Sequence, residues 1–152
     1  MNEISQARAE EVLMINDIAA QDDLASFLEY ALANDLRRKD QNGRNLLHTF
    51  CHFKALRCAT YLISLYPSLA KEKDVMGEIP LHRACYGKNI SKNLITSLLH
   101  LSDINAQNVF GATPLYYAAT TGTREGFDFL TEQGADATLT DKQGRAPSRP
   151  EN

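Results

Sequence analysis

Glycine recurs at a nearly constant interval along this sequence, and this period is its most constraining feature. The spacings are 34, 34 and 33 residues, between Gly43, Gly77, Gly111 and Gly144. An Asp or Asn stands three residues before each glycine, and a leucine stands four residues after each of the first three. A fixed period of this length indicates small units that cannot bury their own apolar faces. The sequence therefore predicts a solenoid in which stacked neighbours share a continuous core.

Each unit is predicted to begin with a turn and to continue with two helices. The turns read DQNGRN, DVMGEI, NVFGAT and DKQGRA, in which glycine supplies a positive φ and Asp or Asn bonds the turn backbone. Pro80 and Pro114 suit the first position of the short helix that follows, since an N–H would have no partner there. The second helix carries an apolar stripe, as in Leu94, Ile95, Leu98 and Leu99.

The N-terminal segment is predicted to form one more helix pair, without a leading turn. Its apolar side chains recur at helical spacing. They are Val12, Leu13, Ile15, Ile18 and Ala19 in the first helix, and Leu24, Phe27, Leu28, Ala31 and Leu32 in the second. Asp22 or Asp23 is suited to cap the second helix. The polar residues that precede Val12 are typical of a solvated end cap.

These units resemble the ankyrin repeat, which reads roughly D-x-x-G-x-T-P-L-H-x-A-A. The stretch NVFGATPLYYAATTG, followed by GADATLTD, is the best match, while DVMGEIPLHRAC and DQNGRNLLHTFC are looser. The resemblance covers about residues 8–147. It implies an all-α fold, an ankyrin-repeat solenoid of about four helix pairs with β-hairpin-like turns between the repeats.

We expect a single ankyrin-repeat domain over residues 1–152. Its parts are an N-terminal capping repeat at 1–39, repeats at 40–73, 74–107 and 108–140, and a truncated repeat or tail at 141–152. Pro147 and Pro150, with no apolar run beside them, predict that the tail forms no further helix. Either the tail folds over the last full repeat, or the chain is cut from a longer one, or a partner covers this end.

Departures from the ankyrin pattern predict locally softened repeats. Lys54 and Lys88 stand where the family favours a glycine between the two helices, and a left-handed lysine costs roughly 1 kcal/mol. Gly87 offers an alternative position for the second of these turns. Asn45 and Ile79 replace the threonine of the motif, and only Asn45 can cap a helix.

His48, Cys51 and His52 could share one helix face, as at the start of a metal site or a Cys–His nucleophile. The ankyrin register implies separate roles: His48 braces the turn, Cys51 is buried, and His52 faces the concave solvent side. Nothing indicates an oxyanion hole or an orienting third group. We therefore predict no enzyme activity, catalytic residue, metal or cofactor. A metal- or thiol-dependent activity at His48, Cys51 and His52 is the alternative.

Composition limits the remaining classes. The net charge is −3 and no basic block occurs beyond residues 37–39, which argues against nucleic-acid binding. No apolar run approaches the ~18 residues of a spanning helix, so no membrane contact is expected. Cys51, Cys58 and Cys85 form no CxxC motif and fit free thiols in a reducing compartment. We expect a cytoplasmic protein that is a monomer when alone, or one in a host cytosol if it is a delivered effector.

The resemblance implies that another protein binds the concave face, which the turn tips and the first helices form. Met76 and Phe110 are apolar at adjacent tips, where turns are usually polar, and this marks an interface unless Phe110 packs on its neighbouring tip. Phe53 and Tyr86 would add aromatic anchors unless they turn inward. The predicted partner-binding residues are Asn42, Arg44, Phe53, Met76, Glu78, Arg83, Tyr86, Phe110, Tyr117 and Thr121. The expected role is a non-catalytic scaffold, adaptor or occluding inhibitor, with a regulatory fragment of a larger protein as a further alternative.

Overall fold

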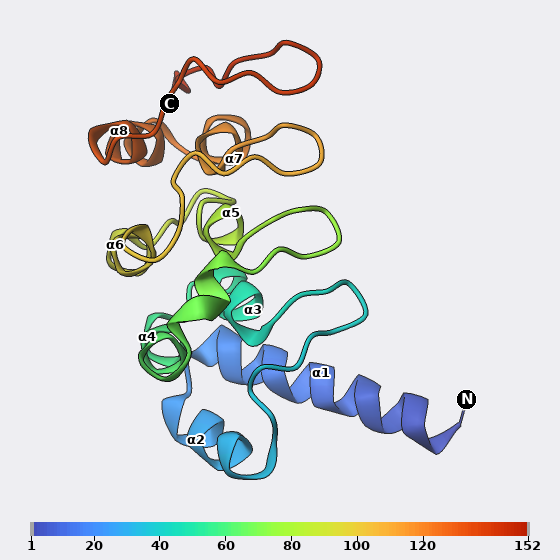
Figure 1. The fold of residues 1–152 in the computed structure, drawn as a ribbon. Helices are drawn as coiled ribbons and strands as arrows, with labels where there is room; N and C mark the ends of the chain where they lie inside the picture. Colours follow the sequence, from blue (N-terminus) through green and yellow to red (C-terminus); the bar gives the residue numbers. More distant parts are fainter. Residues whose placement is uncertain (1, 152) are drawn as a thin grey trace.

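The computed structural model describes residues 2–151, and over this range the chain forms helices and no strands. The elements in chain order are α1 (Glu3–Gln21), α2 (Leu24–Ala33), α3 (Leu46–His52), α4 (Leu56–Leu65), the 3-10 helix η1 (Pro67–Lys71), α5 (Pro80–Ala84), α6 (Lys92–Leu99), α7 (Pro114–Thr121) and α8 (Arg124–Glu132). The α-helices form four consecutive pairs that stack along one axis, with α1 and α2 at one end and the C-terminal tail at the other (Figure 1). The predicted all-α solenoid is confirmed.

Hairpin-like turns project from one side of the stack, and α4, α6 and α8 line the opposite side (Figure 1). Each turn is closed by backbone hydrogen bonds, as where the N–H of Asp74 donates to the carbonyl of Glu78 at 2.9 Å. The Asp74 carboxylate also accepts from the N–H groups of Met76 and Glu78, at 2.8 and 3.0 Å. Gly77 has a φ of 72°, a backbone conformation in which a residue with a side chain would be strained. The DxxG spacing therefore encodes this turn.

Successive turn tips are joined to each other by backbone hydrogen bonds. The N–H of Val75 donates to the carbonyl of Asn42, and the N–H of Val109 donates to the carbonyl of Met76, each at 2.9 Å. A third bond of 2.9 Å runs from Lys142 N–H to the Phe110 carbonyl. The tips are thus fixed relative to one another along the stack.

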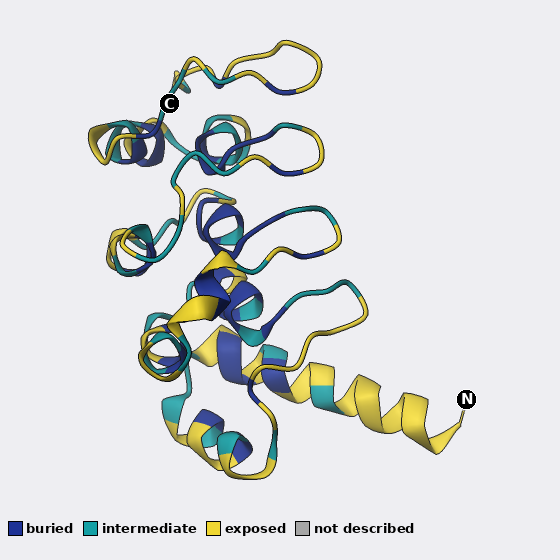
Figure 2. Cartoon of the chain, viewed as in Figure 1, coloured by how far each residue is buried: buried dark blue, intermediate teal, exposed yellow. Residues whose placement is uncertain are grey.

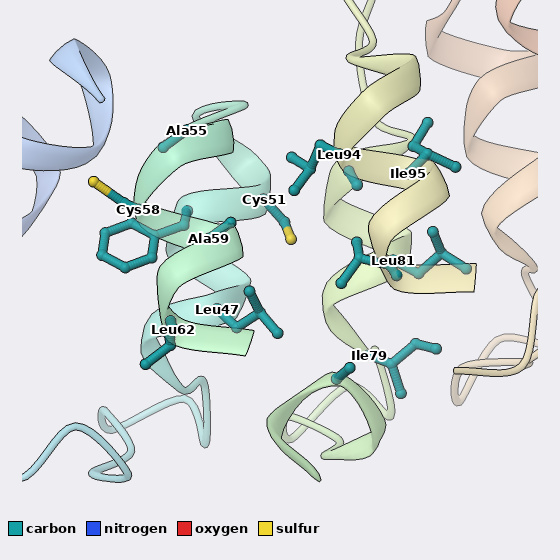
Figure 3. Close-up of a cluster of buried hydrophobic side chains, with 14 of the residues drawn as sticks. Leu47, Cys51, Ala55, Cys58, Ala59, Leu62, Ile79, Leu81, Leu94 and Ile95 are labelled. Carbon is teal, nitrogen blue, oxygen red and sulfur yellow. The ribbon is translucent and has the colours of Figure 1, made fainter. Parts of the chain in front are cut away.

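The core is continuous between neighbouring helix pairs. Leu47 and Cys51 of α3 point towards the next pair, from which Leu81 and Leu94 extend to meet them (Figure 3). All four side chains are fully buried. Because each pair supplies one half of such a layer, a single pair would leave its apolar side chains in water.

The two motif histidines connect one repeat to the next. Nδ1 of His48 accepts from the backbone N–H of Asn45 at 3.2 Å, and its Nε2 donates to the carbonyl of Glu78 in the following turn at 2.8 Å. His82 repeats the arrangement with the N–H of Ile79 and the carbonyl of Ala112, at 3.2 and 3.1 Å. The Asn45 side chain caps α3 through the N–H of His48, whereas Ile79 provides no side-chain cap for α5. The expected bracing role is confirmed and extends across the repeat boundary.

Lys54 has the left-handed conformation expected at its position, with a φ of 60°. Its ammonium group reaches the end of α5 in the next repeat and donates to the carbonyls of Arg83, Ala84 and Tyr86, at 2.8, 3.0 and 2.8 Å. A cation there also faces the negative end of the helix dipole. The prediction of a softened repeat at Lys54 did not include these hydrogen bonds, whose favourable energy offsets the cost of the left-handed backbone.

The second inter-helix turn is shifted by one residue, as the sequence allowed. Gly87, and not Lys88, has the positive φ, at 92°. Its N–H donates to the hydroxyl of Thr121 in the next repeat at 2.8 Å. Lys88 is exposed.

The N-terminal pair departs from the expected apolar face. Helix α1 starts at Glu3, well before Val12, and its N-terminal half is exposed (Figure 2). Val12, Leu13, Leu28 and Leu32 were all predicted to form the apolar face of this pair, but they are exposed. Ile15, Ile18, Ala19 and Phe27, which were predicted together with them, are buried as expected. Helical periodicity therefore identified the two helices and part of their buried face, but it also included side chains that no neighbour covers.

Two adjacent aspartates divide the capping between two helices. Asp23 caps α2, since its carboxylate accepts from the N–H of Ser26 at 3.2 Å. Asp22 instead accepts from the N–H groups of Arg57 and Cys58, at 2.8 and 2.9 Å. Ala55 offers no side-chain cap to α4, so the N-terminal pair caps the second helix of the next repeat.

The C-terminal tail folds back on the last full repeat, the first of the three alternatives that the sequence left open. Arg149 Nε donates to the carboxylate of Asp128 on α8 at 2.6 Å, and Pro147 is buried. No helix forms between Asp141 and Glu151. Among the helices within residues 2–151, none is long and apolar enough to span a bilayer.

Candidate partner-binding surface

The concave surface combines the turn tips with the solvent side of α3, α5 and α7. The structure distributes the ten predicted residues over three levels of exposure. Phe53, Tyr86 and Phe110 are exposed; Asn42, Arg44, Met76, Arg83, Tyr117 and Thr121 are half-buried; and Glu78 is buried. Nine of the ten are thus accessible in part or in full, which is a condition for contact with a partner.

Glu78, which was predicted to bind a partner from a turn tip, is buried and so is not available for such a contact in this structure. Only 4% of its surface is accessible. Its carboxylate accepts a hydrogen bond from the Tyr117 hydroxyl of the next repeat, and Arg83 Nη2 lies 2.8 Å from its other oxygen. A buried carboxylate without partners is unfavourable. The contacts with Tyr117 and Arg83 offset this cost and so allow the Glu78 carboxylate to be buried.

Glu78 belongs to a network of charged and polar side chains beneath the concave surface. Arg44 Nε and Arg83 Nη2 approach the buried carboxylate of Asp74 at 3.4 and 3.9 Å. Asn108 donates to the Tyr117 hydroxyl at 3.1 Å. Burial and the hydrogen bond to Glu78 raise the pKa of Tyr117, so its hydroxyl stays protonated at neutral pH. Two arginines balance two carboxylates, which leaves this part of the surface close to neutral.

Exposed apolar side chains gather at the tips of the second and third turns. Phe110 is 50% exposed, so it does not pack fully on the neighbouring tip. Val75 and Val109 are also exposed, Val75 at 62%. Neither valine was among the predicted residues, although each directly follows the Asp or Asn of its turn. The corresponding residues of the first and fourth turns, Gln41 and Lys142, are polar, and this contrast was the signal available in the sequence.

Aromatic rings continue the apolar surface on the first helices. Phe53 follows α3 and Tyr86 follows α5, and both are exposed rather than turned inward. The Tyr86 ring lies edge-on to the ring of Tyr117, with 5.9 Å between their centroids. The Thr121 hydroxyl is already used in hydrogen bonds within the protein, since it accepts from Gly87 N–H and donates to the Tyr117 carbonyl. The aromatic rings are therefore the more accessible contact groups.

His48, Cys51 and His52 do not converge on a common site. His48 is buried and bonded to backbone groups, while His52 is exposed. Burial raises the pKa of the Cys51 thiol, and burial raises that of Cys85 to about 12, so both remain thiols. Burial, and then the cations of Arg83, Lys54 and Arg44, lower the pKa of His52. Within residues 2–151, no group of three His, Cys, Asp or Glu residues is placed to hold a metal ion.

Four stacked helix pairs with hydrogen-bonded projecting turns define a helical repeat protein of the ankyrin type, a class that binds on an extended concave surface. The family described as ankyrin repeats (3 copies) matches residues 17–108, which is more than half of the chain. The chain belongs to the ankyrin-repeat family, and its repeats form a protein–protein interaction module.

The family match ends at Asn108, the first residue of the third turn, and does not include the pair α7–α8. Among curated proteins, the probable 26S proteasome regulatory subunit p28 of Saccharomyces cerevisiae is similar, at 30% identity over 120 residues. The alignment covers 78% of this chain and 52% of that protein. The chain thus spans about half the length of this curated relative.

Proposed function

We propose that this chain is a non-catalytic module that binds another protein through the concave surface. The observation that carries the proposal is the set of exposed apolar side chains on two adjacent tips, Val75, Val109 and Phe110. Turn residues in water are usually polar, and contiguous apolar surface marks an interaction site. Phe53 and Tyr86 extend the same surface onto the first helices.

The rigidity of the tips supports binding at this surface. Backbone hydrogen bonds fix Val75 against the first tip and Val109 against the second. A partner that covers these side chains therefore orders little additional chain, which lowers the entropic cost of association. Asn42, Arg44, Met76, Arg83, Tyr117 and Thr121 are proposed as the half-buried contacts around these anchors.

A near-neutral, partly aromatic surface suits an apolar protein segment with few charges. Occlusion or scaffolding requires only this contact and no chemistry, so we propose a scaffold, adaptor or inhibitor acting in the cytoplasm. We retain the repeat boundaries 40–73, 74–107 and 108–140 as part of the proposal. The name of the yeast relative refers to the regulatory part of the 26S proteasome, so a purified proteasome regulatory particle is a suitable first candidate partner.

The test is a capture experiment with the immobilised chain and a matched pair of double variants. Val75→Glu/Phe110→Glu places two charges on the tips, whereas Ser64→Glu/Thr96→Glu places the same charges on exposed sites of α4 and α6. The tip variant is expected to bind at least about tenfold more weakly, since each buried apolar side chain contributes ~1.5–3 kcal/mol.

Both variants are first checked for wild-type helical circular dichroism, because none of the four sites is buried. Partners from a lysate of the source organism are identified by mass spectrometry and then measured as purified proteins, alongside the proteasome particle. A partner that the tip variant captures as well as the wild type does would refute the concave assignment, most clearly if the α4–α6 variant loses it.

A further inference from the structure

The two ends of the solenoid differ in how well they are closed. Large apolar side chains are exposed on the N-terminal pair and the adjoining end of α4, namely Ile4, Val12, Leu13, Met14, Leu28, Leu32 and Leu65. Over the described part of the chain beyond Phe110, no large apolar side chain is exposed. A terminal repeat usually presents a polar outer face. The N-terminal end therefore has the apolar character of a surface that something else covers.

Two adjoining grooves hollow this end. The larger, of about 390 Å³, lies between α2 and α4, and its apolar lining includes Leu28, Leu32, Tyr61 and Leu65. Leu32 is 90% exposed at the edge of this groove, so its side chain projects into solvent and is available to a partner.

The smaller groove, of about 340 Å³, lies between α1 and α2 and is lined by Met14, Ile18 and Tyr30. Glu29 on α2 borders both grooves. We call the two together the N-terminal grooves. The two grooves lie on either side of α2, so there is apolar surface on both sides of this helix.

The charge of this end is negative, in contrast to the rest of the chain. Residues 1–39, the N-terminal repeat, hold eight carboxylates and four basic side chains, a net charge of −4, and Arg38 pairs with Glu11. The other residues hold 12 basic and 11 acidic side chains, a net charge of +1, and the two parts together give the overall −3. The excess of carboxylates is therefore confined to the segment that carries the grooves.

Carboxylates border the apolar floors directly. Asp17 lines the smaller groove, Glu29 both, and Asp35 the larger. Neither Asp17 nor Glu29 has an ion-pair partner within residues 2–151. Asp35 lies 3.6 Å from Arg37, which also stands over the Tyr66 ring, but both charged groups are mostly exposed and the pair is screened by water. The rim thus offers free negative charge beside apolar surface.

We propose that the N-terminal grooves bind a basic amphipathic helix of a partner protein. Such a helix presents apolar side chains at i, i+3, i+4 and i+7 to the floors and Lys or Arg side chains to the carboxylates on the rim. A second copy of this end would bring −4 against −4, and nucleic acids or anionic lipid surfaces would be repelled in the same way. The site is separate from the concave surface and does not depend on it.

The probe is a fluorescein-labelled peptide of about 18 residues, with leucines at i, i+3, i+4 and i+7 and lysines elsewhere, so that it forms about five helical turns. A peptide with the same composition in scrambled order is the control for charge alone. Fluorescence anisotropy with the intact chain is expected to show at least about tenfold tighter binding of the amphipathic order, because only that order aligns a single apolar face with the floors.

Two variants locate the binding, and two more serve as controls. Leu32→Glu and Glu29→Lys are each expected to weaken it at least about tenfold, and since both sites are exposed, folding is not at risk. Thr96→Glu on α6 is the matched control and should leave the affinity unchanged. Val75→Glu, which tests the concave surface, should also leave it unchanged, so failure of the proposed function and failure of this inference are distinguishable.

Three results would overturn the inference. Equal affinity for the scrambled peptide would reduce the site to unspecific attraction of positive charge. Unchanged affinity in Leu32→Glu would remove the apolar grooves from the binding site. Sedimentation showing a wild-type dimer that Leu32→Glu converts to a monomer would identify the occupant as a second copy of the chain.

Discussion

Replacing Lys54 tests whether a strained lysine stabilises this solenoid. Lys54→Met keeps most of the side-chain stem and the left-handed backbone but removes the ammonium group. Lys54→Gly removes the ammonium group and the backbone strain together. Lys88→Met is the matched control, because Lys88 occupies the equivalent sequence position in the next repeat, is exposed, and leaves the turn to Gly87.

The expected changes in the free energy of unfolding follow from the three hydrogen bonds of Lys54 and from its burial. A net contribution of ~1.5–3 kcal/mol is typical of a hydrogen bond to a charged group, but three bonds from one ammonium are not additive. Burial also lowers the pKa of Lys54, which shows that desolvation opposes the charged form. We therefore expect Lys54→Met to lower the free energy of unfolding by about 2 kcal/mol. Lys54→Gly also removes the backbone strain of about 1 kcal/mol. Its free energy of unfolding should therefore lie between that of Lys54→Met and that of the wild type.

Urea unfolding followed by circular dichroism gives these free energies from the midpoint at constant slope. Lys88→Met should stay within about 0.5 kcal/mol of the wild type, as for most exposed substitutions. The reasoning is refuted if Lys54→Met also stays within that range, or if Lys54→Gly is more stable than the wild type. The first outcome would mean that the three bonds to the end of α5 contribute almost nothing to stability. The second would mean that the backbone strain outweighs them.

Two further predictions concern the cap of α4 and the buried histidines. Asp22→Ala should destabilise the chain by about 1–2 kcal/mol through loss of the cap, and Asp22→Asn by less, as measured by urea unfolding; equal losses would show that the acceptor role is unimportant. Burial lowers the pKa of His48, His82 and, with the help of nearby cations, His52 below the ordinary value of 6.5. The unfolded chain then binds more protons just below pH 6.5, so stability should fall as the pH drops from 6.5. The fall is up to about 1.4 kcal/mol per pH unit for each of the buried His48 and His82, and much less for His52, which is exposed and screened by water. Urea midpoints at about pH 7.5, 6.5 and 5.5 check this, and a constant midpoint would contradict it.

The parts of the fold that follow local rules were predictable from the sequence. The DxxG turns, the proline-started helices and the apolar stripes depend on residues within a few positions of one another. The roles of Lys54 and Asp22 were not predictable in this way. Their hydrogen-bond partners lie 29 to 36 residues away, and spacing rules for a single helix contain no information about such partners.

The candidate site shows the same division. Its proposed location at the tips follows from the repeat register, and the exposure of Phe110 follows from its position in a projecting turn. Glu78 was misplaced because its equivalence to Arg44 in the register concealed Tyr117, which lies 39 residues further on and accounts for its burial. Leu28 and Leu32 were assigned to the apolar face because helical spacing reveals that face but not the absence of a neighbour to cover it.

The bonds between successive tips also determine how the solenoid responds to mechanical load. Along the tip edge, neighbouring repeats are joined by backbone hydrogen bonds of 2.9 Å, which weaken steeply when they are stretched. Along the opposite edge, α4 and α6 meet through side-chain packing, which permits small sliding displacements. A bending force should therefore spread the outer helices first, while Val75 and Val109 keep a constant separation at the inextensible edge.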